Sequence, residues 1–339
     1  MPPTLNTPRL RRVPAACLPV LLFLALASCQ VPVHKQSGVS MSSALNFLVS
    51  GRARPDWKAL FAYADAEAAL FDWRRAEGPV GRLNRGEALV PPPEVAAALS
   101  AALEVARASD GAFDPTVLPL SLLWSFDTGG RLPAEADIRR ALRFVGWRRV
   151  SVGVDGRVRL PAGFGLDLGG IAQGAVVDLL GAYLEQRGRH DYLVEASGDI
   201  LVSGLKRGRE AWSVAIRHPR KSQGYVGIVK LGAAGRKLAI VTSGDYERFF
   251  VQGGVRYHHI LDPATGYPSR GLVSVTVIAP TCTEADALST TVFVLGLERG
   301  LALLEGRQGT EGLLIGETGS GLEARTTAGF PLSPAELKL

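Results

Sequence analysis

The stretch VSVTVIAPTCTEADALSTTVFVLG, residues 273–296, decides the fold. Its first seven residues are small, apolar or β-branched, which is typical of a strand, and Pro280 ends that run. The residues that follow contain neither glycine nor proline before Gly296, and Thr281 with Glu284 forms a T-x-x-E capping pattern. The sequence therefore predicts a strand that leads directly into a helix beginning near residue 281 or 283.

The rest of the chain predicts more helices and more strands in separate blocks. Apolar residues at helical spacing predict helices at 56–73 and 94–108, and a third helix at 170–187 that follows a short apolar strand. Glycine, proline and aspartate turns separate the predicted strands, which are 191–203, 212–217, 226–231, 238–242, 246–251, 255–261 and 273–279. Helices early, strands later and helices again indicate an α+β domain.

Composition indicates one globular domain. The 339 residues are 47% hydrophobic and 21% charged, which is typical of a folded chain with a large core. After residue 40 we find no long linker, charge block or repeat, so residues 41–339 are predicted to form one unit.

The N-terminus has the features of an export signal. Arg9, Arg11 and Arg12 precede an apolar run at 13–27, and Leu-Ala-Ser-Cys at 26–29 matches a lipobox. We therefore expect a signal peptide at 1–28, a lipid on Cys29, a polar tether at 29–40, and a location on the periplasmic side of a bacterial membrane. The alternative is an ordinary signal peptide with a chance cysteine. The apolar run is shorter than the roughly 20 residues that span a bilayer.

The cysteine count and the charge limit the possible partners. Cys17 leaves with the predicted signal and Cys29 takes the lipid, so Cys282 has no partner for a disulfide. The formal charge of +6 includes the three signal arginines, and their removal leaves 35 basic and 32 acidic residues, a net charge of +3. We therefore expect no nucleic-acid partner.

Asp286 and Thr290 are the candidate metal ligands. They stand four residues apart, which places a carboxylate and a hydroxyl on one face of the predicted helix. Hard cations such as Mg²⁺ prefer oxygen ligands of this kind. The alternative is a capping role for Asp286 toward Thr283, although Thr281 and Glu284 already meet the capping pattern.

The segment LDLGGIAQGAVVD, residues 166–178, is a candidate phosphate or metal turn. Gly169 and Gly170 let the backbone approach a ligand, donate amides to a phosphate, or offer a carbonyl to a metal. The alternative is a glycine turn needed only for close packing. Gly163 and Gly165 could begin a G-x-G-x-x-G motif, but Leu168 stands at the position of its third glycine. The sequence therefore does not support a Rossmann site.

Two further segments have both a functional and a structural interpretation. SDGAFDPTVLPL, residues 109–120, places an aromatic ring beside a carboxylate, or is a helix end with a core phenylalanine. Residues 241–268 predict a hairpin around Gly253 and Gly254 that ends in two adjacent histidines and a D-P-A-T-G turn. Adjacent strand residues point to opposite faces, so only one histidine can face a site.

Together and in this order, from Met41 to about Gly296, these segments resemble the ApbE family of bacterial FAD:protein FMN transferases. The resemblance implies a single ApbE-like domain with mixed or antiparallel sheets flanked by helices. It also implies that Mg²⁺ is bound by Asp286, Thr290 and the backbone carbonyl of Gly170. The FAD contacts that it implies are Met41, Ala112, Phe113, Asp114, Asp167, Gln173 and Leu261.

The implied activity is the Mg²⁺-dependent transfer of FMN from FAD to a threonine or serine hydroxyl of a target flavoprotein, with AMP released. The implied acceptors are flavoprotein subunits of membrane electron-transfer systems, and His259, in the family's H-I-x-D-P position, is the candidate general base. The sequence departs from the family at Gln173, often lysine, at Ser42-Ser43, and at 73–81. FAD hydrolysis to FMN and AMP, and a non-catalytic FAD-binding lipoprotein, therefore remain alternatives.

Overall fold

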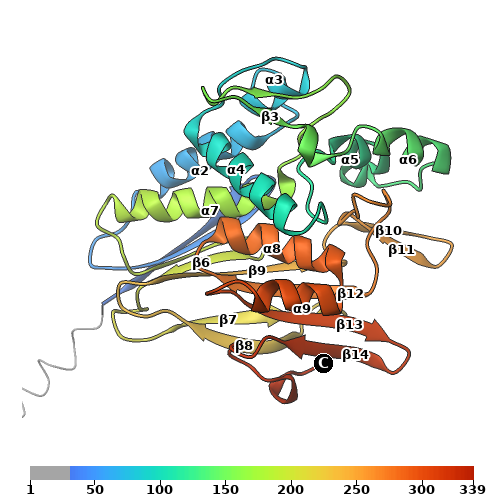
Figure 1. Cartoon of the computed structure of the whole chain (residues 1–339). Helices are drawn as coiled ribbons and strands as arrows, with labels where there is room; N and C mark the ends of the chain where they lie inside the picture. Colours follow the sequence, from blue (N-terminus) through green and yellow to red (C-terminus); the bar gives the residue numbers. More distant parts are fainter. Residues whose placement is uncertain (1–30) are drawn as a thin grey trace, which may run out of the picture.

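An eight-stranded antiparallel sheet organises the molecule, and the computed structural model describes residues 31–339 (Figure 1). Its strand order is β1-β2-β5-β6-β9-β12-β13-β14, and every neighbouring pair is antiparallel. The strands are β1 Val33–Ser40, β2 Ser43–Ser50, β5 Tyr192–Ala196, β6 Asp199–Ser203, β9 Lys237–Gly244, β12 Leu272–Ala279, β13 Glu311–Thr318 and β14 Gly321–Thr326.

Helices cover one face of this sheet and a hairpin covers the other (Figure 1). The helical layer contains α2 Trp57–Phe71, α4 Pro93–Ala108, α7 Gly169–Glu185, α8 Cys282–Leu295 and α9 Leu297–Glu305. The hairpin consists of β7 Trp212–Arg217 and β8 Tyr225–Leu231. Strand residues alternate between the two layers: in β9, Val241 packs in the helical core and Ile240 in the core beneath the hairpin.

Smaller elements pack around the helical layer. A hairpin of β10 Phe249–Gln252 and β11 Val255–His258 packs against α5 Leu118–Trp124 and α6 Glu135–Leu142. The Trp124 ring holds this region together, with Phe250, Tyr257 and Tyr267 at centroid distances of 5.6–6.3 Å. The remaining elements are α3 Pro79–Asn84, β3 Ser151–Val152, β4 Val158–Arg159, and the 3₁₀ turns Phe126–Thr128, Trp147–Arg149 and Pro334–Glu336.

The structure confirms the α+β prediction, the helices at α2, α4 and α7, and the passage from β12 into α8. Thr281 caps α8 as predicted, because its side chain accepts a hydrogen bond from the Glu284 amide at 3.2 Å. The short strand predicted before α7 is wrong. Only Gly165 forms a bridge there, to Val117, and the chain then turns into the helix.

The predicted tether at 29–40 is wrong over Val33–Ser40, which form the edge strand β1. All eight β1 residues pair with β2, from Val33 opposite Ser50 to Ser40 opposite Ser43. This segment is mostly polar and lacks the alternation of apolar residues by which a strand is recognised in sequence. Its backbone hydrogen bonds to β2 hold it in the sheet instead. The folded unit therefore begins before residue 41, and the predictions for 1–28 and for Cys29 lie outside the described residues. No helix within residues 31–339 meets the length and hydropathy needed to cross a membrane.

Candidate functional site at the crossing of α7 and α8

The helices α7 and α8 cross in close contact at Gly174. A Cβ at this position would lie 2.4 Å from the carbonyl oxygen of Cys282 and 2.9 Å from the Cβ of Asp286, so only glycine permits this approach. The Gly174 amide also donates to Oδ2 of Asp286 at 3.1 Å. The glycine thus brings the N-terminal halves of both helices together and fixes the Asp286 carboxylate between them.

Asp178, one turn further along α7, holds the start of α8. Its carboxylate accepts hydrogen bonds from the amides of Cys282 and Thr283 at 2.9 and 2.8 Å, and from the Thr283 hydroxyl at 2.6 Å. These amides would otherwise have no partner at the helix N-terminus. Asp178 therefore fixes the position of α8 relative to α7, while Asp286 keeps no capping duty.

The three predicted metal ligands meet at this crossing. Asp286 is buried and points toward α7. Thr290 lies next to Gly170, because a Cβ on Gly170 would stand 3.5 Å from the Thr290 Oγ1. Gly170 therefore lies beside the Thr290 hydroxyl, and Asp286 contacts the next turn of the same helix, so oxygen atoms from two helices lie near one another.

Asp199, which the sequence analysis missed, adds a second carboxylate. It begins β6, is only 5% exposed, and its Oδ2 has no hydrogen-bond partner. Burial raises its pKa well above the usual range, and the neighbouring Asp286 raises that pKa further. Burial also raises the pKa of Asp286. One feature of the sequence could have identified Asp199. It directly follows the Ser197-Gly198 turn and stands two residues before the buried Leu201, so both side chains point to the same face of the strand.

These residues fit a bound divalent cation. Two buried carboxylates lie side by side, and within residues 31–339 neither Asp199 nor Asp286 is ion-paired with a basic side chain. Ionised carboxylates are costly to bury without a compensating positive charge. The described residues contain no cluster of three His, Cys, Asp or Glu side chains able to hold a metal alone. A cation here would therefore also need the hydroxyl, the carbonyl and ligand oxygens, which are the donors Mg²⁺ prefers.

Hydroxyl groups from β9 orient the Thr290 side of the site. The Ser243 hydroxyl is 2.7 Å from that of Ser289 and 3.5 Å from that of Thr290. Ser289 also donates to the carbonyl of Asp286 at 3.0 Å. The strand β9 thus contacts the same face of α8 that carries the candidate ligands.

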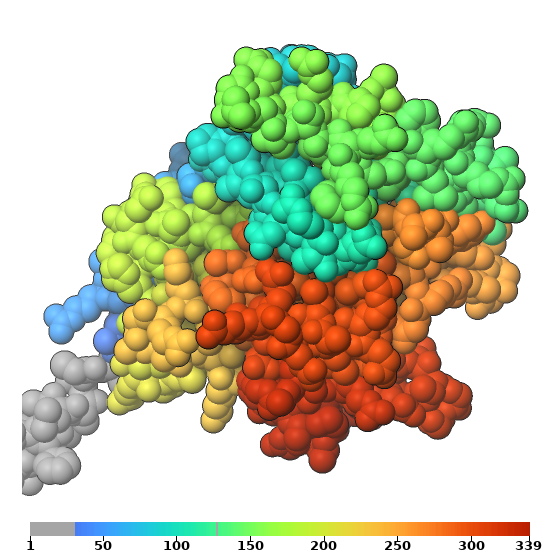
Figure 2. Space-filling model, viewed as in Figure 1, coloured from blue at the N-terminus to red at the C-terminus, as the bar shows by residue number. Residues whose placement is uncertain are grey.

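The loop after α4 closes one side of the site. The Phe113 ring lies 3.1 Å from the Cβ position of Gly170, and Figure 2 shows the α4 segment lying against α8. Asp114 accepts hydrogen bonds from the amides of Thr116 and Trp147 at 2.8 Å, and from the Thr116 hydroxyl at 2.6 Å. Burial raises the pKa of Asp114 despite these bonds. Ala112, Phe113 and Asp114 are therefore held rigidly beside α7.

The predicted contacts Asp167 and Gln173 lie at the start of α7, whereas Met41 lies between β1 and β2. Asp167 accepts from the Gly169 amide at 2.9 Å, and Gln173 donates to the Ala196 carbonyl at 2.6 Å. Gln173 also hydrogen-bonds Asp199, which lowers the pKa of that carboxyl in opposition to burial. Met41 occupies the β1–β2 turn with a left-handed φ of 55°.

The structure places His259 and Leu261 on the β10–β11 side, outside the α7–α8 crossing. Nδ1 of His259 lies 3.2 Å from the Arg248 carbonyl, whereas His258 is buried with Nε2 2.9 Å from the Ser269 carbonyl. The adjacent histidines therefore differ in environment, as strand alternation predicts. Leu261 packs with Trp124.

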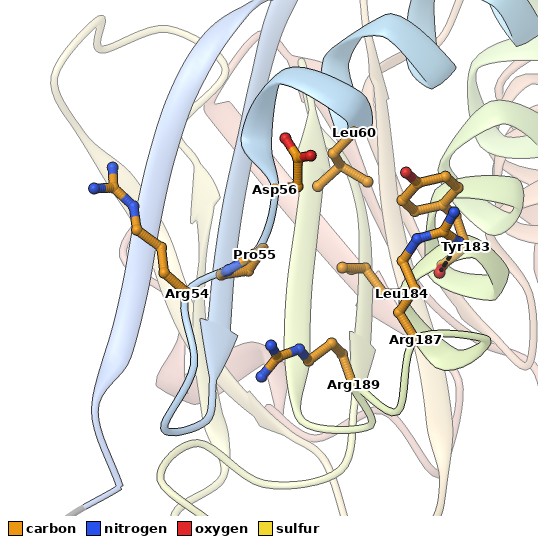
Figure 3. Close-up of a pocket in the computed structure, with 8 residues that line it drawn as sticks. All are labelled: Arg54, Pro55, Asp56, Leu60, Tyr183, Leu184, Arg187 and Arg189. Atoms are coloured by element: carbon orange, nitrogen blue, oxygen red, sulfur yellow. Dashed lines mark hydrogen bonds between the residues drawn. The ribbon is translucent and has the colours of Figure 1, made fainter.

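Two cavities elsewhere do not contain these predicted residues. A cavity of about 290 Å³ lies under the other face of the sheet, between Glu195, Thr242 and Tyr246. A smaller one of about 100 Å³ lies at the far end of α7, beside Leu60 and Tyr183 (Figure 3).

Comparisons with known proteins identify the family of this chain. The ApbE family model matches residues 41–314. A protein named FAD:protein FMN transferase from Treponema pallidum is 40% identical over 237 residues, which cover 65% of this chain and 64% of that protein. A Haemophilus influenzae protein of the same name is 28% identical over 350 residues and covers 95% of this chain and 98% of its own length. The match thus spans slightly under two thirds of the Treponema protein.

Solved structures show the same fold. The ApbE protein of Thermotoga maritima aligns with a TM-score of 0.80 at 32% identity, covering 88% of this chain and 98% of that one. The flavin transferase ApbE from Vibrio cholerae aligns with a TM-score of 0.77 at 30% identity, covering 88% and 99%. The family match over most of the sequence, together with this fold, shows that the chain belongs to the ApbE family.

Proposed function

We propose that this protein is an FAD:protein FMN transferase that uses Mg²⁺ at the α7–α8 crossing. One observation carries the proposal: Asp286, Thr290 and Gly170 converge next to a buried, unpartnered oxygen of Asp199. The relatives named above carry this activity in their names, and the shared fold supports the same reaction here.

Asp286, Thr290 and the Gly170 carbonyl would hold the cation. When bound, Mg²⁺ withdraws charge from a diphosphate and fixes its orientation. Helix α7 begins at Gly169 and Gly170, so the positive end of its dipole would favour an anionic ligand there. Phe113 and Asp114 border the same space. These residues would bind the FAD diphosphate and orient the phosphorus of its FMN half.

In the proposed reaction a threonine or serine hydroxyl of the acceptor forms a bond to that phosphorus. The bond from the phosphorus to the bridging oxygen breaks, AMP leaves with that oxygen, and the hydroxyl proton goes to a base. We propose His259 as this base: it lies outside the crossing itself, but the adjacent His258 ring is 5.4 Å from that of Phe293 on α8, and the His259 ring is only partly buried and fixed at Arg248. Positioning of the reactants supplies much of the rate in phosphoryl transfer, so loss of a base would leave residual turnover.

Incubation with FAD, Mg²⁺ and a threonine-containing acceptor peptide tests the proposal. We expect covalent FMN on the peptide by mass spectrometry, one AMP per FMN, and loss of both products with Asp286→Asn or with EDTA. AMP without labelled peptide would show a hydrolase. Neither product, with FAD still bound, would show a binding protein.

We also propose that the chain is exported and held at a bacterial membrane by a lipid on Cys29. The lipobox at 26–29 supports this proposal. Such an anchor would keep the enzyme near flavoprotein subunits of membrane electron-transfer systems, its proposed acceptors. Intact mass of the purified membrane form tests it, with a diacylglyceryl-modified N-terminal Cys29 expected and an unmodified cysteine contradicting it.

A further inference from the structure

The end of the molecule where β1 begins carries a cluster of basic side chains. They come from three connections: the residues after β2, the residues after α7 and the β6–β7 loop. We call this surface the basic end, and it consists of Arg52, Arg54, Arg187, Arg189, Lys206, Arg207 and Arg209.

Backbone contacts bring the three connections together. The Ser50 amide donates to the Asp191 carbonyl at 2.8 Å, and the Arg207 amide donates to the Ser50 hydroxyl at 2.9 Å. The Arg189 guanidinium lies 2.9 Å from the Cβ position of Gly51. In Figure 2 this end is the left side, where blue, yellow-green and yellow segments meet. The charges thus form one surface, although the connection after β2 lies more than 100 residues from the other two in sequence.

Most of this positive charge is not neutralised within the protein. Among the described residues, Arg52, Arg54, Arg187, Arg189 and Lys206 form no ion pair. Arg207 and Arg209 share the single carboxylate of Glu210 at 3.8 and 3.7 Å.

The nearby acidic residues are engaged with the backbone. Asp56 accepts from the Ala59 amide at 3.1 Å as the cap of α2, and Asp191 accepts from the Leu205 amide at 2.9 Å. Figure 3 shows Arg54 pointing away from the small cavity, with Arg189 beneath Pro55. Arg187 lies over the Tyr183 ring at 3.4 Å. Seven cationic groups therefore face Asp56, Asp191 and Glu210 at this end, while Glu185 pairs with a further cation, Lys237, at 3.2 Å. The excess of positive charge favours an anionic surface.

The edge strand places this surface close to the proposed lipid. Val33 is already paired with Ser50, and the Pro32 carbonyl accepts from the Gly51 amide at 3.0 Å. Only Gln30, Val31 and Pro32 separate Cys29 from β1, a distance of at most about 14 Å even when fully extended. A lipid on Cys29 would therefore hold the basic end at the headgroup layer.

We propose that the basic end is a docking surface for anionic phospholipid headgroups. A lipid on Cys29 would attach the chain to the bilayer, and a polybasic surface adds electrostatic attraction to anionic headgroups. The 17 residues of α7 span about 25 Å from this end to Gly170, so docking would direct the α7–α8 site away from the bilayer. The orientation rests on the proposed attachment at Cys29, whereas the affinity for anionic lipid does not.

Vesicle binding tests the surface without the lipid. The processed chain, residues 29–339 with Cys29→Ser, is titrated with phosphatidylglycerol–phosphatidylcholine vesicles and with pure phosphatidylcholine vesicles. The test variant carries Arg52→Gln, Arg54→Gln and Arg189→Gln. The control carries Arg139→Gln, Arg140→Gln and Arg143→Gln at α6, which changes the net charge equally on another side. Unchanged thermal unfolding establishes that both variants fold.

We expect binding to the anionic vesicles alone, weakened by salt. Each basic residue near such a surface contributes roughly fivefold in affinity, so the test variant should bind about 100-fold more weakly while the control changes little. Equal binding by wild type and test variant, equal loss in the control, or binding only to neutral vesicles would overturn the proposal. Failure to bind any vesicle would also overturn it and leave an acidic protein partner as the explanation. The mass of Cys29 in the native protein tests the anchor separately.

Discussion

Gly174→Ala should separate α7 from α8 and weaken the cation site. The added Cβ would lie 2.4 Å from the Cys282 carbonyl oxygen and 2.7 Å from its carbon. Close carbon–oxygen contacts in proteins lie at about 3.3 Å, so the helices must move apart by about 0.9 Å. The obstacle is backbone at the capped start of α8, which cannot rotate away as a side chain would.

The expected loss of stability follows from two opposing effects. Overpacking of a closely packed interface costs about 1–3 kcal/mol. Replacing a helical glycine by alanine regains about 1 kcal/mol through helix propensity. We therefore expect a net loss of up to about 2 kcal/mol in the free energy of unfolding. A displacement near 1 Å in the site should lower the rate of FMN transfer by roughly 100-fold.

Three assays test this prediction: urea unfolding, Mn²⁺ titration and FMN transfer. Gly319→Ala is the control, because Gly319 is exposed on the β13–β14 turn and a Cβ there meets no atom within 4 Å. We expect the control to match wild type in all three. A Gly174→Ala protein with wild-type Mn²⁺ affinity and transfer rate would refute the claim that close helix contact builds the site.

Three further variants separate the roles of the surrounding residues. Asp199→Asn should lower Mn²⁺ affinity about tenfold or more in calorimetric titration, because it removes a buried charge beside Asp286; unchanged affinity would give Asp199 a packing role only. Asp178→Asn weakens the cap of α8, so it should lower the free energy of unfolding by about 1–3 kcal/mol. The Mn²⁺ affinity should change much less. An unchanged urea midpoint would contradict this prediction. Gln173→Lys places an ammonium group near Asp199, so it should raise the melting temperature measured in EDTA. It should also reduce the further rise in melting temperature on adding Mg²⁺. The same rise with Mg²⁺ in wild type and variant would contradict this prediction.

Local patterns predicted the elements whose signals lie within one segment. The T-x-x-E cap and uninterrupted helical spacing located α8, and Asp286 and Thr290 share a face because four residues make about one helical turn. The glycine pair at 253–254 located the β10–β11 hairpin in the same way. These features depend on neighbours in sequence, so one segment suffices to predict them.

Features set by distant partners could not be predicted. The polar strand β1 is held by backbone pairing to β2, which leaves no apolar alternation to detect. Asp199 joins the site because β6 lies beneath both helices, and Asp286 is 87 positions away in sequence. Asp178 had no motif to identify it as the cap of α8, 104 residues further on. Tertiary packing creates these relations.

A crystal of the protein grown with FAD and Mn²⁺ tests the central claim most directly. Anomalous scattering locates Mn²⁺ independently of the protein model. We predict one peak at coordination distance from the Asp286 carboxylate, the Thr290 hydroxyl and the Gly170 carbonyl, in contact with the FAD diphosphate. FAD bound with its diphosphate away from α7, or a Mn²⁺ peak elsewhere with none at the α7–α8 crossing, would contradict the account.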